Sequence, residues 1–321
     1  MLIESLLVLV VAYFIAFIIP GIERKIQARI QRRYGPPILT PGFWSILKFT
    51  YKKGVKPDSP SPWLYHLSLI LAFASTSFLL LWTTPFWAGV MGFATYLGLA
   101  GLLKVEEVTY LFMGSLSQSV MSKSMAFPDT ISGAKPEGIR SFFEEHAAVR
   151  ALKMITLGSF PFYLALAVPF MSAYSLDVNS VLENTPVIYT ISGVLGAIVY
   201  FFGYNIVSNN RPFDIIKPKV DVIEGPYMEY AGKWRALSYE MRGLLMFVLS
   251  SMFVSLYLGI PLAFDIPEVL ATHLALAFVL PCLSAVLKAF SPVLTFKQIY
   301  PISSALTVLG FLALVLNYFG V

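Results

Sequence analysis

Long apolar runs recur along this 321-residue chain, and they leave few folds open to it. With 57% hydrophobic and 13% charged residues, the chain cannot hide its apolar surface inside a soluble globule of this size. A helix that crosses a bilayer needs about 20 apolar residues. We therefore predict an all-α polytopic membrane protein, a single transmembrane domain of residues 1–321 with about eight transmembrane helices. The expected spans are 2–20, 63–82, 86–113, 151–173, 186–208, 242–262, 268–287 and 299–320.

The third run is ambiguous, because three charged residues inside it could mark a loop between two short spans. Basic residues favour the cytoplasmic side of a membrane. With eight spans, the three external loops contain no Lys or Arg, whereas a ninth span would place Lys123, Lys135 and Arg140 outside. We therefore expect one long third helix in a multi-pass protein of the plasma membrane, with both termini outside. The cytoplasmic loops would be 21–62, 114–150 and 209–241.

The first of these loops is strongly basic. Between residues 21 and 62 there are nine Lys or Arg but only two acidic residues, Glu23 and Asp58. Such a segment is expected beside anionic lipid headgroups. Around Ile46 and Leu47, apolar residues recur at helical spacing between lysines, which predicts an amphipathic helix in the interface. Packing on the membrane surface alone would explain that pattern.

Several classes of site are absent from the pattern. The chain has one cysteine, Cys282, in apolar sequence, so it cannot build a cysteine-ligated metal or iron–sulfur centre. Its three histidines stand far apart without metal-ligand spacing. There is no phosphate-binding glycine loop and no nucleophile motif, and the modest charge of +5 lies beside membrane segments. We expect no bound cofactor, no self-contained catalytic site and no nucleic-acid partner.

Two acidic residues inside the third span are candidates for an ion pathway. A carboxylate near the bilayer centre costs roughly 2.5 to 3.5 kcal/mol on insertion scales, so Glu106 and Glu107 require an explanation. Lys104 can reach Glu107 at a spacing of three residues but not Glu106 at two. For Glu107, a structural ion pair and an ion pathway are therefore both open. For Glu106, which has no such neighbour, we favour the pathway.

The third long loop alternates the signs of its charges. Charges this close to lipid suggest pairing within the loop and docking onto another polar surface. Solvated loop charges are an equally good explanation for Lys217, Lys219 and Asp221. The charged residues that could serve docking or an ion path here are Arg211, Asp214, Asp221, Glu224, Glu229 and Glu240.

Two separate motifs, in this order, resemble a known family. The first contains Glu23-Arg24-Lys25, Arg29, Arg33 and Gly35-Pro36-Pro37, and the second contains Arg211-Pro212-Phe213-Asp214 and Glu229-Tyr230-Ala231-Gly232. The chain resembles, over nearly its whole length, the subunit-1 (H-type) membrane subunit of respiratory complex I and of energy-converting membrane-bound [NiFe] hydrogenases.

The resemblance implies a protein that joins two arms of a complex. Its cytoplasmic loops would dock hydrogenase-like large and small subunits and an iron–sulfur subunit, which would hold the iron–sulfur clusters and the NiFe centre. Its intramembrane acids would begin a path towards antiporter-like membrane subunits. By this resemblance Glu23, Arg24, Lys25, Arg29 and Arg33 brace the interface with the redox module. Asp214, Glu229 and Glu240 would lie on the loop that senses the redox event, and Glu107 would be the entrance of the ion path.

The chain departs from the complex I pattern at several acidic positions. Complex I members carry glutamates after the Phe-Asp pair, where this chain has Lys217, Pro218 and Lys219. They also carry a glutamate a few residues before the fourth-helix proline, where this chain has Gly158 and Ser159. These differences favour the hydrogenase-type, quinone-independent branch.

We therefore expect the anchor and coupling subunit of a redox-driven ion pump. The alternatives are a quinone-reducing complex I subunit, a stand-alone secondary transporter with Glu106 and Glu107 as its binding site, and a purely structural scaffold. The terminal electron acceptor and the coupled ion, H⁺ or Na⁺, stay open at this point.

Overall fold

A computed structural model describes residues 2–57, 59–90, 92, 94–117, 142–216, 224–264 and 266–320. Within those ranges the regular structure is helical, and the only strand-like feature is an isolated antiparallel pairing of Thr95 with Asp177. Six helical segments are long and apolar enough to cross a membrane. They are α1 (Leu2–Ile30), α3 (Pro62–Trp82), α7 with α8 (Phe142–Lys153 and Phe160–Ser172), α11 (Lys233–Leu258), α12 with α13 (Pro267–Ala277 and Val279–Phe290) and α14 (Phe296–Tyr318).

Two further helices complete the set of eight that the hydropathy pattern predicts. Helix α10 (Ile191–Val207) is apolar but only 17 residues long, and α5 (Tyr96–Leu116) carries three charged residues along its 21. Short helices lie at the ends of the spans or, for the turn between α7 and α8, inside one. They are α2 (Ser45–Tyr51), α4 (Pro85–Val90), α9 (Val178–Glu183), the π-helical turns η1 (Thr40–Trp44) and η2 (Met154–Gly158), and the 3₁₀ turns η3 (Val187–Tyr189) and η4 (Gly225–Tyr227).

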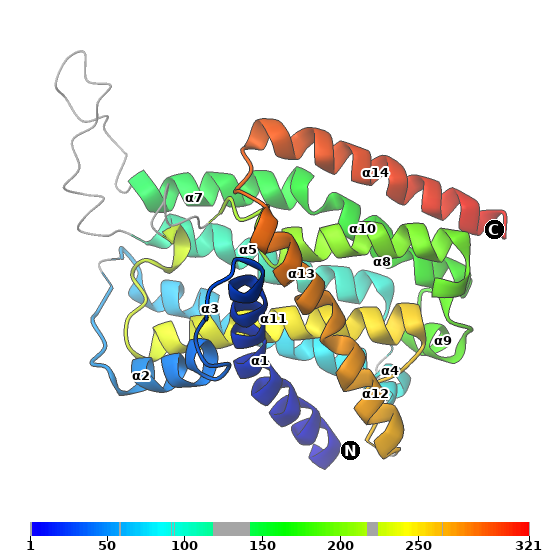
Figure 1. Ribbon diagram of the computed structural model, residues 1–321, viewed down its shortest axis with the longest axis horizontal. Helices are drawn as coiled ribbons and strands as arrows, with labels where there is room; N and C mark the ends of the chain where they lie inside the picture. The colour runs from blue at the N-terminus through cyan, green and yellow to red at the C-terminus, as the bar shows by residue number, and fades with distance from the viewer. Residues whose placement is uncertain are drawn as a thin grey trace.

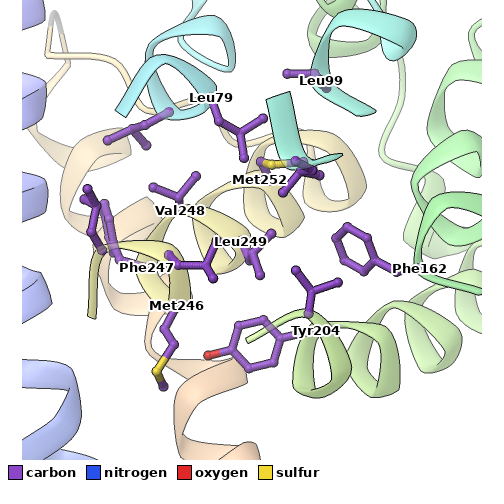
Figure 2. Packing of buried hydrophobic residues seen from close by; sticks show 14 of the residues in the cluster. Leu79, Leu99, Phe162, Tyr204, Met246, Phe247, Val248, Leu249 and Met252 are labelled. Carbon is purple, nitrogen blue, oxygen red and sulfur yellow. The ribbon is translucent and has the colours of Figure 1, made fainter. Parts of the chain in front are cut away.

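Helix α11 occupies the centre of the bundle. In its most apolar window 83% of the residues are buried, against 28% to 61% in the other five candidate spans. Figure 2 shows Met246, Val248 and Met252 of this helix among side chains from its neighbours, including Leu79 of α3 and Phe162 of α8. Most of the long helices run side by side, whereas α1 and the α12–α13 pair cross them obliquely (Figure 1).

Close packing of α1 on α11 depends on a glycine. A Cβ added at Gly243 would lie 2.3 Å from the backbone oxygen of Ala16, far inside any real contact distance. Ala12, Ala16 and Ile19 are buried on the facing side of α1. The glycine therefore lets the two helix backbones approach, as small residues do at helix interfaces in membranes. This contact fixes the middle of α1 against the first half of α11.

The prediction of one long third helix over 86–113 is wrong. The run divides into α4, which ends at Val90, and α5, which begins at Tyr96. Thr95 caps α5, because its hydroxyl accepts a hydrogen bond from the Gly98 N–H at 3.2 Å. The residues before it pair with the segment after α8, where Val178 N–H donates to the Ala94 carbonyl at 2.9 Å. The break precedes the charged residues, which lie on unbroken helix.

The predicted loops also begin and end differently, because helices extend beyond their apolar runs. Helix α1 continues ten residues past the predicted end at residue 20, and its 29 residues span about 43 Å. Helix α11 begins at Lys233 and α7 at Phe142, inside segments predicted as loops. The amphipathic helix predicted near Leu47 is present as α2, and it packs against α11. Glu23 through Arg29 therefore lie on a helix.

Candidate functional site

A charged cavity opens where α1, α11 and α13 meet the segments that connect the spans. Its volume is about 590 Å³. That volume lies within the range of small-molecule sites. Its walls come from the last turns of α1, the 211–214 segment, η4, the first turns of α11, and the end of α13. The charged side chains that line it are Glu23, Arg24, Arg211, Asp214, Glu224, Arg235, Arg242 and Lys288. We call this the charged cavity.

Two ion pairs hold the charged cavity together. Lys288 of α13 donates to the Glu23 carboxylate of α1 at 2.5 Å, and both side chains are more than 90% buried. Arg235 of α11 pairs with Glu224, the residue before η4, and also donates to the Tyr227 carbonyl at 3.2 Å. Glu224 has a positive φ of 69°, so the ion pair holds a strained backbone position in place.

The remaining charges of the charged cavity are mostly cationic. Of the five cations and three carboxylates that line it, three cations and one carboxylate remain outside the two ion pairs. Arg242 donates to the side-chain oxygen of Asn210 at 3.2 Å. The Asn210 amide donates in turn to the Ser284 hydroxyl at 3.3 Å, and Ser284 donates to Asn205 at 2.6 Å. A buried polar network therefore runs from the cavity between α10 and α13, and the cavity presents an excess of positive charge.

The two intramembrane acids lie on α5, and both are buried. Lys104 donates to the Glu107 carboxylate at 2.6 Å, as the three-residue spacing predicts. The same ammonium donates to the Ile155 carbonyl at 2.9 Å and to the Ser159 hydroxyl at 3.0 Å. Tyr163 of α8 donates to the same carboxylate oxygen at 3.2 Å. Glu107 is thus fixed between α5 and the η2–α8 segment.

Glu106 faces the charged cavity through two tyrosines. The hydroxyl of Tyr110, one turn along α5, interacts with the Glu106 carboxylate and with Tyr227. The rings of Tyr110 and Tyr227 meet edge to face, with centroids 5.9 Å apart. Tyr227 itself lines the charged cavity, and burial raises the pKa of its hydroxyl above the usual range. Two tyrosine side chains therefore lie between the cavity wall and the buried acid.

The structure brings together only part of the predicted docking set. Among the basic residues of the first motif, only Arg24 lines the charged cavity. Lys25 donates to the Tyr34 carbonyl at 3.2 Å, Arg29 lies over the Tyr34 ring, and Arg33 bonds to Gln31. These side chains brace the segment after α1 and do not line the cavity.

The remaining predicted residues are scattered. Asp221 lies outside the described residues. Glu229 is half-buried, after η4 and away from the cavity lining. Glu240 is buried in α11, and neither of its carboxylate oxygens has a hydrogen-bond partner among the residues that the structure describes. The described residues also contain no group of three or more His, Cys, Asp or Glu side chains that could hold a metal ion.

Three of the charged residues that line the charged cavity were not predicted. Lys288 follows an apolar run directly, so the sequence alone presents it as a lysine flanking a span. Its partner Glu23 is 265 residues away, and no local pattern links them. Arg235 and Arg242 lie two turns apart on α11, a spacing that could have indicated one charged helix face.

The chain is similar to proteins of respiratory membrane complexes. It is 41% identical over 313 residues, 96% of its length and 95% of the relative's, to an uncharacterised protein of Methanocaldococcus jannaschii. It is 24% identical over 243 residues to the H-type subunit of the NADH-quinone oxidoreductase of Carboxydothermus hydrogenoformans, 74% of this chain and 64% of that protein.

A chain of an archaeal respiratory complex, the membrane-bound sulfane sulfur reductase, shares the fold. Its TM-score is 0.79 at 22% identity, and the alignment covers 98% of this chain and 99% of that one. The family model described as NADH dehydrogenase matches residues 3–318, almost the entire sequence. With that coverage, and with the two motifs placed on the charged cavity and the segments around it, the chain belongs to the NADH dehydrogenase family of membrane subunits.

Proposed function

We propose that the chain anchors a peripheral electron-transfer module to the membrane and couples it to ion translocation. The observation that carries this proposal is the connection between the charged cavity and the buried acids. Tyr227 lines the cavity, and Tyr110 joins it to Glu106. A change of charge in the cavity would therefore act on a carboxylate through groups that can pass a proton. In a site of low dielectric constant such an effect is much stronger than in water.

The orientation that we propose places the charged cavity on the cytoplasmic side and both termini outside. Basic residues of α1 and of the segment after it lie at the cavity end of the bundle, and the positive-inside bias assigns that end to the cytoplasm. The excess of cations at the cavity favours an acidic docking surface on the partner. The partners would be hydrogenase-like large and small subunits and an iron–sulfur subunit on this side, with antiporter-like subunits beside the bundle. The redox cofactors would be held by those partners.

Family membership favours this role over a stand-alone transporter. Helix α5 also runs unbroken from Tyr96 to Leu116 through both acids, whereas transporters commonly break helices at their binding sites. Purification in mild detergent tests the choice. We expect the chain to co-purify with iron–sulfur and nickel-containing subunits. Isolation as a monomer or homo-oligomer without them would reject the proposal.

A second candidate is quinone reduction at the charged cavity. Its volume of about 590 Å³ would accommodate a small-molecule headgroup, and relatives of this chain are named as components of NADH-quinone oxidoreductase. The hydrogenase-type role predicts that electron transfer by the purified complex does not depend on quinone. Loss of activity on quinone extraction, with recovery on adding it back, would select the quinone-reducing role instead.

Substitution of the intramembrane acids tests the coupling role. We expect Glu106→Gln and Glu107→Gln to leave assembly and electron transfer to soluble acceptors intact, while ion pumping into vesicles falls. Glu145→Gln is the matched control, because Glu145 is an exposed glutamate on α7. Unchanged pumping in both buried variants would remove these acids from the mechanism and leave a structural scaffold.

A further inference from the structure

The ammonium group of Lys104 is held by three oxygen ligands between α5 and the η2–α8 segment, although 38% of the lysine side chain is exposed. Its three N–H donors meet the Glu107 carboxylate at 2.6 Å, the Ile155 carbonyl at 2.9 Å and the Ser159 hydroxyl at 3.0 Å. Its fourth side lies over the Tyr163 ring, with the nitrogen 4.3 Å from the ring centroid. An ammonium has three donors and no acceptor, so this arrangement satisfies it fully. We call this arrangement the Lys104 site.

One of these ligands is a backbone carbonyl, and the other two are side-chain oxygens. Ile155 lies in the π-helical turn η2, and Ser159 connects that turn to α8. π-Helical turns inside α-helical segments occur frequently at functional sites. The Ser159 hydroxyl also donates to the Ile155 carbonyl at 3.2 Å, so these two oxygens lie together. A carboxylate, a carbonyl and a hydroxyl are the oxygen types that hard cations take in proteins.

From this geometry we propose that Lys104 is a built-in cation that excludes Na⁺ from Glu107 and leaves it to exchange protons only. A sodium ion bound to Glu107 would need the oxygens that the ammonium already holds. It would also lie about 4 Å from a fixed positive charge. At an effective dielectric constant of about 20, that repulsion lowers affinity by roughly 1000-fold. This proposal rests on the proposed coupling role, because it specifies which ion that role would move. The exclusion of Na⁺ from Glu107 can nevertheless be measured on the complex when it is not turning over.

The space beside Glu107 suits a proton route as well. A cavity of about 10 Å³ is lined by Glu107, Ser159 and Asn209, among others. That volume accepts about one water molecule and is too small for a hydrated metal ion. The side-chain oxygen of Asn209 is buried there without a hydrogen-bond partner among the described residues. One water could therefore connect Glu107 with the segment that leads to Asn210 and the charged cavity.

Sodium binding to the purified complex tests the proposal. We would measure equilibrium binding of ²²Na⁺ to the wild-type complex and to Lys104→Met, Lys104→Arg and the double variant Lys104→Met/Glu107→Gln. Lys104→Met empties the oxygen set, so we expect Na⁺ affinity to rise roughly 100- to 1000-fold. Lys104→Arg keeps the charge and should bind no more Na⁺ than the wild type. The double variant should lose this gain in Na⁺ affinity.

Lys153→Met is the matched control, because Lys153 is exposed and also lies over an aromatic ring, that of Phe296. Absence of any gain in Lys104→Met would overturn the proposal. If Lys104→Met fails to assemble, Na⁺ binding to Lys104→Gln is compared with Na⁺ binding to the wild-type complex instead. Sodium binding by the wild type that disappears in Glu107→Gln would equally refute it.

The outcome can be separated from that of the coupling role. If Glu107→Gln pumps normally while Lys104→Met gains Na⁺, the coupling role fails but the exclusion stands. If pumping falls in Glu107→Gln and Lys104→Met gains nothing, the coupling role stands and the ion selectivity must arise elsewhere.

Discussion

The ion pair between Glu23 and Lys288 offers the sharpest test of how the charged cavity is held. Lys288→Met would leave the Glu23 carboxylate buried without its partner. At 2.5 Å and an effective dielectric constant of about 20, the attraction that is lost amounts to about 7 kcal/mol. Desolvation of both charges offsets much of it, and breaking a buried pair typically costs about 3 to 5 kcal/mol. Since both residues line a cavity that water can enter, we expect a loss of about 3 kcal/mol, the lower end of that range.

The double variant separates the pair from the individual side chains. In Glu23→Gln/Lys288→Met no charge is left unpaired, so most of the loss should be recovered. Membranes containing the complex are heated and then extracted with detergent. The measurement is the temperature at which half of the chain is no longer recovered in the detergent-soluble fraction. We expect Lys288→Met to lower this midpoint by roughly 5 °C or more. Lys297→Met, at an exposed lysine in the first turn of α14, should leave it unchanged.

Two outcomes would refute this reasoning. If Lys288→Met and Lys297→Met behave alike, the pair contributes nothing to the fold. If the double variant is as unstable as the sum of the single variants, the two side chains act independently, and the short contact is incidental to stability.

Two further predictions concern packing and the η4 turn. Gly243→Ala places a methyl group against the Ala16 backbone and should lower the same thermal midpoint. Gly101→Ala is the control, because nothing lies within 4 Å of the added methyl group. It should be neutral or stabilising by up to about 1 kcal/mol. Equal midpoints would show that α1 can move away from α11. Arg235→Ala removes the partner of Glu224 and a donor to the η4 turn, at a cost of about 1 to 3 kcal/mol, and should speed limited proteolysis near residues 224–232. Proteolysis no faster than in Lys233→Ala, an exposed control, would reject that role.

The local features of the fold were predictable because they follow from short-range physics. Hydropathy located the six helical segments that are long and apolar enough to cross a membrane and the shorter apolar helix α10, and the spacing of apolar residues predicted α2. The pair of Lys104 with Glu107 followed from their positions on one helix. The break before Tyr96 was missed, because the residues there pair with the segment around Asp177, some 80 residues later. Hydropathy contains no information about such a contact.

The charged cavity was only partly predictable for the same reason. The motifs indicated Glu23, Arg24 and Asp214, which do line it. They also indicated Lys25 and Arg29, whose side chains instead bind at Tyr34. A continuous helix separates its side chains by about 100° per residue, so neighbouring basic residues cannot all face one cavity. The sequence alone does not show that α1 extends to Ile30. It therefore could not distinguish the basic residues that face the cavity from those that do not.

The Glu23–Lys288 contact has a consequence for biosynthesis. A ribosome working at about 5 to 20 residues per second needs roughly 13 to 50 seconds to make the 265 residues between the two partners. Throughout that interval Glu23 has been made and its lysine does not yet exist. The wall shared by α1 and α13 closes only after the penultimate span has been inserted. The charged cavity therefore lacks this wall until translation is almost over, and under the proposed docking role a peripheral partner would meet a complete cavity only then.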